Sequence, residues 1–339
     1  MTKKLSTAVT LDYRNTAPLP AWVKEVIDAQ LEIEAEDAKS AGTLGFMARA
    51  LVIATMPYKD PKADSFTRIN GDFKLRILAG YEGGIPFGIY PRLLMSWVAT
   101  EAVKKQSPVI ELGDSLSIFL RDVLELKSTG GGSRGSGSRV LEQTKRLFGS
   151  MITAQYGGTQ EHRGFVLKNV LIADDLELDE KDIEKFENLD SEESDKSHAL
   201  WIPQGKHEVG QWKSKVRLSN NFFQECITSP VPIDLRAFKA LRASPLAMDL
   251  YNWLTYRMSY TSKRSRPIRW ESLMMQFGSN YNTADISQAT RNFKKQFLKA
   301  LKMVLVVYPQ ANVEISENGF VLLPSRPHIL PATKQTSLF

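Results

Sequence analysis

The hydrophobic pattern of the chain is clearest between Asp285 and Met303, where apolar residues recur every three or four positions. Asp285 is a residue type that caps the first turn of a helix, and Gln288 follows three residues later, as in a capping box. The pattern therefore predicts a helix. Its core face comprises Ile286, Ala289, Thr290, Phe293, Phe297, Ala300 and Leu301.

The opposite face of this predicted helix is basic and carries two amides. Cations at this spacing can bind phosphates, and Asn or Gln amides can bind the edge of adenine. A basic face on a single helix can equally be a solvated surface, so the DNA-binding interpretation depends on the surrounding elements. The candidate DNA-binding residues here are Gln288, Arg291, Asn292, Lys295, Lys299 and Lys302.

The elements around this helix follow the order of a winged helix, which is a helix-turn-helix with a β-hairpin wing. Residues 214–324 read as strand, short helix, capped helix from Ser244, short strand near Ile268, two more helices, and strands joined by a turn at Asn318-Gly319. Residues 305–308 are predicted to be extended. Basic side chains beside this unit are candidates for clamping the DNA backbone: Lys263, Arg264 and Arg266.

Residues 44–173 repeat the order. Helix 89–105, strand 109–112, helix 114–126, a glycine-rich turn and a helix from Ser138 precede two strands. Asn70-Gly71 predicts a β-hairpin ahead of them. The candidate DNA-binding residues of the third helix are Arg139, Gln143, Lys145 and Arg146.

The predicted fold class is α+β, with two tandem winged-helix domains behind an N-terminal extension of a helix and a hairpin. The expected divisions are an arm with an acidic helix (1–43), a first winged helix with its preceding hairpin (44–173), an acidic linker (174–213), a second winged helix (214–324) and an extended tail (325–339).

Charge is distributed unevenly along the 339 residues. The net charge is +6, yet residues 174–195 contain twelve acids and two lysines, a local charge of −10. From Trp201 onward, nineteen Lys or Arg residues face eight Asp or Glu residues. A basic half is typical of a protein with a polyanionic partner, although it can also serve solubility alone.

The sequence gives no support for catalysis, a metal or another cofactor. The four histidines and Cys226 lack zinc-ligand spacing, and the glycine-rich turn lacks the Lys-Ser/Thr ending of a phosphate-binding loop. Tyr251, Tyr256 and Tyr260 share a helix and read as core or surface aromatics. A single cysteine, no apolar run of ~20 residues and no signal-like N-terminus predict a cytoplasmic protein without membrane contact.

Several stretches resemble the RepA-like plasmid replication initiators. They are LGFMARALVIATMP (44–57), FGIYPRLLMSWVATEAV (87–103), ELGDSLSIFLRDVL (111–124), VPIDLRAFKALRASPLAMDLYNWLTYRMSY (231–260) and FLKALKMVLVVYP (297–309). The resemblance implies binding to repeated origin sites (iterons) in double-stranded DNA and help in opening an A·T-rich segment. It also implies recruitment of the host replication initiator and helicase. Members of such a family often exist both as monomers that initiate replication and as homodimers that repress their own gene.

The last five residues resemble the pentapeptide by which bacterial proteins bind the sliding clamp. Leu338 and Phe339 would fill an apolar pocket and Gln335 would hydrogen-bond at its rim, which could give roughly 3–5 kcal/mol before ordering costs. Two other functions stay open for the whole chain. One is a winged-helix transcriptional regulator without a replication role, and the other is a protein-interaction scaffold with solvated basic faces.

Overall fold

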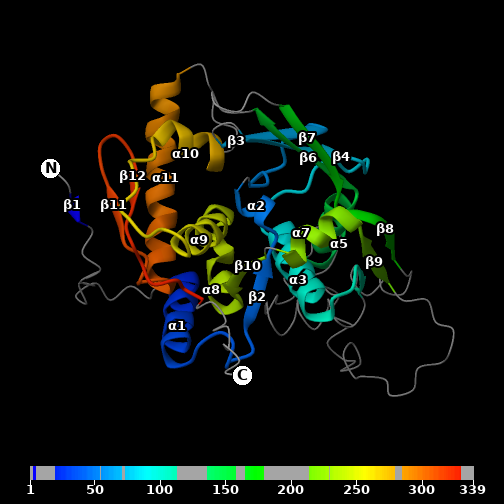
Figure 1. Cartoon of the computed structure of the whole chain (residues 1–339), viewed down its shortest axis with the longest axis horizontal. Coiled ribbons are helices and arrows are strands. Elements are labelled where there is room, and N and C mark those ends of the chain that lie inside the picture. Colours follow the sequence, from blue (N-terminus) through cyan, green and yellow to red (C-terminus); the bar gives the residue numbers. More distant parts are fainter. Residues whose placement is uncertain are drawn as a thin grey trace, which may run out of the picture.

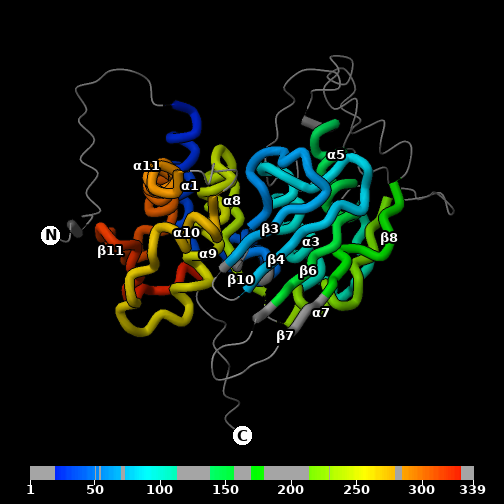
Figure 2. The backbone as a smooth tube through the Cα atoms, turned by 90° about the horizontal axis from the view of Figure 1, so that it is seen from above, coloured from blue at the N-terminus to red at the C-terminus, as the bar shows by residue number. Residues whose placement is uncertain are grey.

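The computed structural model describes residues 3–4, 20–53, 55–70, 73–112, 136–157, 165–178, 214–228, 230–278 and 285–329. Helices and antiparallel sheets alternate along the chain, which confirms the predicted α+β class. Two units lie side by side in Figures 1 and 2. The helical unit contains the described residues of 235–329 with α1 (Ala21–Ala35), and the sheet unit contains the described residues of 65–178 and 214–228.

The helical unit is built around α11 (Ile286–Val307). Besides α1, the described part of the unit contains α8 (Leu235–Ala240), α9 (Pro245–Met258) and α10 (Trp270–Phe277), with a 3-10 turn at Leu241–Ala243. The hairpin β11 (Val313–Ile315) and β12 (Phe320–Leu322) closes the unit, and β1 (Lys3–Lys4) pairs with β11. The core is aromatic: Trp253, Trp270, Phe277, Phe293, Phe297 and Phe320.

The sheet unit packs two sheets around α3 (Tyr90–Lys105) and α5 (Ser136–Phe148). One sheet has the order β3-β4-β6-β7, formed by Ser65–Asn70, Phe73–Ala79, Ser150–Gly157 and Phe165–Leu171. The other has the order β5-β9-β8, formed by Val109–Glu111, Lys215–Leu218 and Ala173–Glu177. The helix α7 (Asn220–Thr228) follows β9. The hairpin predicted from Asn70-Gly71 is confirmed by the pairing of β3 with β4.

Two long-range strand pairings cross the predicted domain boundaries. Residues Leu44–Met47 form β2, which pairs with β10 (Val231–Asp234), and only then does the short helix α2 (Arg49–Ile53) begin. The sequence pattern predicts a short helix over residues 46–54, and that prediction is therefore wrong at its start. Strand β9, predicted to open the second domain, pairs with β5 and β8 of the sheet unit. The start of the predicted acidic linker is strand β8.

The two units are joined by a buried ion pair between α3 and α9. Arg92 is 1 % exposed, and its Nε and Nη2 atoms donate to the two carboxylate oxygens of Asp249 at 2.8 and 2.7 Å. The same guanidinium donates to the carbonyls of Met56 and Pro57 at 2.7 and 3.2 Å. Burial raises the pKa of the Asp249 carboxyl, and the Arg92 guanidinium opposes that effect.

Helix α11 is longer than its sequence pattern predicted. Residues 305–307, expected to be extended, form its last turn, because Val304 and Val307 continue the buried stripe. The burial of its first residue was also predicted wrongly: Ile286 was assigned to the core face and is 57 % exposed. Among the helices that the structure describes, none is long and apolar enough to span a membrane.

Candidate nucleic-acid interface

The start of α11 is fixed by its cap. The Asp285 carboxylate accepts a hydrogen bond from the Gln288 backbone N–H at 2.8 Å, as the sequence predicted. The second half of the predicted capping box does not form, because the Gln288 side chain bonds along the helix instead. Phe293, Phe297 and Leu301 are each at most 1 % exposed, so the opposite face of α11 is held toward solvent.

The solvent face of α11 carries all six predicted contact residues. Gln288, Arg291, Asn292, Lys295, Lys299 and Lys302 are all exposed. Gln288 Nε2 donates to Asn292 Oδ1 at 3.0 Å, and Arg291 Nη2 donates to Gln288 Oε1 at 2.8 Å. The amides and the guanidinium thus form one hydrogen-bonded row at the N-terminal end, and the three lysines follow it. The helix has five basic residues and no acid.

The loop between α9 and α10 carries further cations and lies against the β11–β12 hairpin. Lys263 and Arg266 are exposed, as the sequence prediction requires. Arg264 is also exposed, but its Nη2 atom lies 2.8 Å from Glu314 Oε2 of β11. Binding of Arg264 to a phosphate would therefore compete with an ion pair to the hairpin.

The third helix of the sheet unit, α5, presents fewer candidate DNA-binding side chains to solvent than predicted. Gln143 was wrongly placed on the surface: it is 5 % exposed, and its Oε1 accepts the Phe87 backbone N–H at 2.9 Å. Arg146 is mostly buried and donates to Glu142 Oε1 at 2.8 Å, with its guanidinium over the Phe87 ring. Only Arg139, which is exposed, and Lys145, which is half-buried, remain available for DNA.

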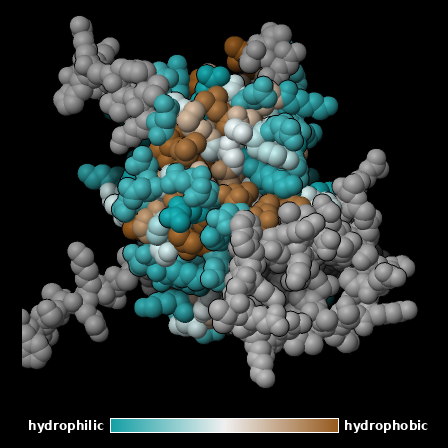
Figure 3. All heavy atoms as spheres, turned by 90° about the vertical axis from the view of Figure 1, so that its right-hand side faces the viewer, coloured by the Kyte–Doolittle hydropathy of each residue, from teal (hydrophilic) through white to brown (hydrophobic). Residues whose placement is uncertain are grey.

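The surface of the sheet unit is also less uniform than that of α11. Figure 3 shows hydrophobic side chains exposed between hydrophilic ones on this side of the molecule. In the four-stranded sheet, Leu78, Met151 and Leu171 pair across neighbouring strands, and Leu171 is 48 % exposed. Described residues of this unit therefore do not form a continuous basic face.

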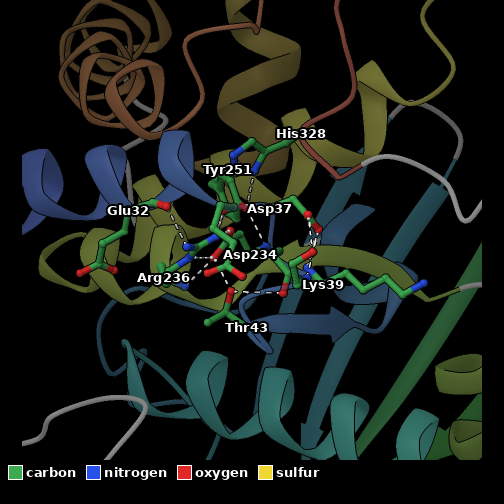
Figure 4. Close-up of polar contacts among 11 residues, drawn as sticks. Glu32, Asp37, Lys39, Thr43, Asp234, Arg236, Tyr251 and His328 are labelled. Carbon is green, nitrogen blue, oxygen red and sulfur yellow. Dashed lines mark hydrogen bonds and ion pairs between the residues drawn. The ribbon is translucent and has the colours of Figure 1, made fainter.

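A polar network holds α1 and the C-terminal segment against the helical unit (Figure 4). Asp234 caps α8 and accepts from Arg236 Nη2 at 2.7 Å, while Arg236 also donates to the carbonyls of Glu32 and Glu36 near the end of α1. The Tyr251 hydroxyl accepts the Asp234 backbone N–H at 2.9 Å and lies 2.8 Å from His328 Nδ1. Tyr251, which the sequence left open as a core or surface aromatic, is a core residue.

Burial lowers the pKa of His328 to about 4, so the ring is neutral in the folded protein at pH 7. The segment from residue 325 to Ile329 was predicted to be an extended tail. It packs against the helical unit through contacts of Arg326 and His328. The predicted clamp-binding residues Gln335, Leu338 and Phe339 lie outside the described residues, as do the predicted helix 114–126 and most of the glycine-rich turn.

Sequence reasoning missed the residues that face α11 from other parts of the chain. A groove of about 850 Å³ is lined by Lys295 and Lys299 together with Trp22 of α1 and Lys59. Neither Trp22 nor Lys59 lies in a recognisable motif. The charge of Lys59 was the sole signal available, and a lone surface lysine does not predict a site.

The family model for plasmid-encoded RepA proteins matches residues 85–272, more than half of the chain. No curated protein sequence matches the chain. A crystal structure of selenomethionine-substituted domains 2 and 3 of RctB is similar with 11 % identity and a TM-score of 0.44, covering 81 % of this chain and 98 % of that chain.

A second structure of RctB domains 2 and 3 has 12 % identity and a TM-score of 0.43, covering 80 % of this chain and 95 % of that one. Likeness at this level carries no functional conclusion. The match to the family model spans α3, the Arg92–Asp249 pair, α9 and the start of α10. The chain belongs to the family of plasmid-encoded RepA proteins.

Proposed function

We propose that this protein initiates plasmid replication by binding iterons, with residues 245–322 acting as a winged helix. The order of α9, the bridge from Ile268 to Phe320, α10, α11 and the β11–β12 hairpin matches that of a winged helix. The observation that carries the proposal is the exposed face of α11, which joins six DNA-compatible side chains on one capped and firmly packed helix.

The two ends of that face have different proposed tasks. Recognition helices contact base edges with their N-terminal residues, so Gln288, Arg291 and Asn292 would bind bases. Their mutual hydrogen bonds fix the amides in one orientation and would be exchanged for bonds to base edges. Lys295, Lys299 and Lys302 lie further along and would bind phosphates.

The remaining cations would support this contact. Lys263 and Arg266 would bind the backbone beside the helical unit, and Arg264 would join them when its bond to Glu314 exchanges. In the sheet unit, Arg139 and Lys145 would contact a neighbouring stretch of the same site. The Arg92–Asp249 pair keeps the two units at one spacing, as binding of one site by both units requires.

Membership of the RepA family supports a proposal for the wider role. We propose a cytoplasmic, plasmid-associated protein that acts by binding rather than as an enzyme, promotes opening of the origin, recruits the host replication initiator and helicase, and represses its own gene as a homodimer. Gln335, Leu338 and Phe339 remain the proposed contact with the sliding clamp, on the strength of their resemblance to the clamp-binding pentapeptide.

The proposal is tested by titrating the full chain against a duplex of the direct repeats beside its own gene, with a scrambled duplex at two salt concentrations. Binding that prefers the repeats by ~10³ or more supports an iteron-binding protein. Equal weak binding to both duplexes refutes it. Specific binding by a chain that does not sustain a plasmid lacking its own initiator would indicate a transcriptional regulator instead.

Two substitutions separate base contacts from phosphate contacts. Gln288→Ala should cost about 1–3 kcal/mol on the repeats and little on the scrambled duplex, because it removes a base contact. Lys295→Ala should weaken binding to both duplexes equally and reduce the salt slope by about 1. Gln310→Ala, at an exposed position beyond α11, is the matched control. Unchanged affinity in both variants would exclude this face as the DNA contact.

A further inference from the structure

The groove beside α11 brings together cations from distant parts of the chain. Lys295 and Lys299 line it from α11, Lys59 lines it from the segment after α2, and Ser244 and Pro245 line it from the start of α9. No acidic residue is among its lining residues in the described structure. Its volume is about 850 Å³, and its other lining residues are uncharged, so the three lysines are the charged groups of the groove among the described residues. An anionic occupant is the one that this lining favours.

The start of α9 adds to the positive potential of the groove. Ser244 caps this 14-residue helix by accepting the Ala247 backbone N–H at 3.2 Å, and Pro245 occupies its first turn. The positive end of the helix dipole therefore points toward the groove, where it favours phosphate oxygens. This contribution supports the lysines and does not define the site by itself.

Lys59 is held in place by its neighbours. The Tyr58 ring lies 5.0 Å from the Arg92 guanidinium carbon and 5.7 Å from that of Arg68. The Pro57 carbonyl accepts from both Arg92 and the Gly88 backbone N–H. The segment that carries Lys59 is thus tied to the ion pair that joins the two units. Its position relative to Lys295 and Lys299 follows from this packing.

We propose that this groove binds the phosphate strand that borders the major groove when α11 lies in duplex DNA, and that Lys59 is a phosphate contact. The inference rests on the proposed function. A helix in the major groove has a phosphodiester strand on either side, and the groove is lined by Lys295 and Lys299, two of the three lysines of α11 that are proposed to bind phosphates. The segment between α2 and β3 would then contact DNA through Lys59, next to the recognition helix.

The test measures the affinity of the full chain for the repeat duplex, the scrambled duplex and a single strand of equal length, over a series of salt concentrations. Lys59→Ala should reduce the salt slope by about 0.9 and weaken binding to both duplexes about fivefold near 0.15 M salt. Lys59→Arg should stay within about twofold of the wild type because it keeps the charge. Lys104→Ala removes an exposed lysine from the end of α3 and is the charge-matched control.

Each outcome decides the inference. An effect of Lys59→Ala equal to that of Lys104→Ala overturns it, while specific binding by the wild type would leave the proposed function intact. If Lys59→Ala weakened binding to the single strand and left binding to both duplexes unchanged, the inference would also be overturned, because the groove would then bind unpaired DNA. A wild-type chain that binds none of the three DNAs would refute the proposed function itself.

Discussion

Removing the carboxylate of Asp249 should destabilise the whole chain, because it leaves the Arg92 guanidinium buried without a counter-charge. Arg92 is 1 % exposed, and two of its five N–H groups point at Asp249 at 2.8 and 2.7 Å. Breaking a buried pair by removing one partner costs about 3–5 kcal/mol. The Met56 and Pro57 carbonyls stay in contact with the guanidinium, so we expect Asp249→Ala to lie near the lower end, about 3 kcal/mol.

Urea denaturation followed by circular dichroism measures this loss as a shift of the unfolding midpoint. The matched control is Glu314→Ala, which breaks an ion pair with the exposed side chain of Arg264. It should lower the free energy of unfolding by less than about 1 kcal/mol. A double variant, Arg92→Met with Asp249→Leu, replaces the pair by apolar side chains. It should be more stable than Asp249→Ala, since no charge is left buried.

Two results would refute this reasoning. A loss for Asp249→Ala no larger than that for Glu314→Ala would mean that water or the carbonyls already neutralise the guanidinium. A double variant that is less stable than the single variant would mean that the pair contributes through its geometry and not through the avoided burial of one charge.

Two further predictions concern the helical unit. The pKa of His328 is about 4 in the folded chain and ~6.5 in the unfolded chain, so the unfolded state binds the proton first as the pH is lowered. The free energy of unfolding should therefore fall by about 3 kcal/mol as the pH drops from ~6.5 to about 4. His328→Gln should flatten that part of the pH profile of urea midpoints, and an unchanged profile would contradict the assignment. Gly319→Ala should cost about 1–3 kcal/mol, because its Cβ would meet the Ile268 carbonyl oxygen at the bridge to Phe320. Asn318→Ala, next to it in the turn, is the control. Equal unfolding midpoints for the two variants would show that the Ile268–Phe320 bridge accommodates the added Cβ without loss of stability.

Local patterns predicted the helical unit well and the joints between units poorly. The 3.6-residue period and the Asp285 cap were sufficient for the start and the buried stripe of α11 up to Leu301, and Ser244 with Pro245 was sufficient for the start of α9. These signals depend on neighbours in sequence. The pairing of β2 with β10 depends on a partner far along the chain, and four residues of strand have no periodicity long enough to oppose a helix prediction.

The candidate site shows the same division. The exposed face of α11 could be read from the sequence because one helix supplies all of it. Gln143 could not, because its burial comes from contact with Phe87, which lies outside its own helix. Lys59 was missed for the converse reason: its relevance comes only from packing beside Lys295 and Lys299. Residues whose surroundings come from elsewhere in the chain are the ones that sequence patterns misplace.

The pairing of β2 with β10 also has a consequence for synthesis of the chain. Thr43 and Asp234, which contact each other beside this pairing, are 191 residues apart. At ~5–20 residues per second, a ribosome needs about 10 to 40 s to make the intervening chain, and β2 waits unpaired for that time. Such high contact order slows folding and leaves an open strand edge on the nascent protein. Chaperone supply during translation should therefore limit how much active initiator a cell obtains from each message.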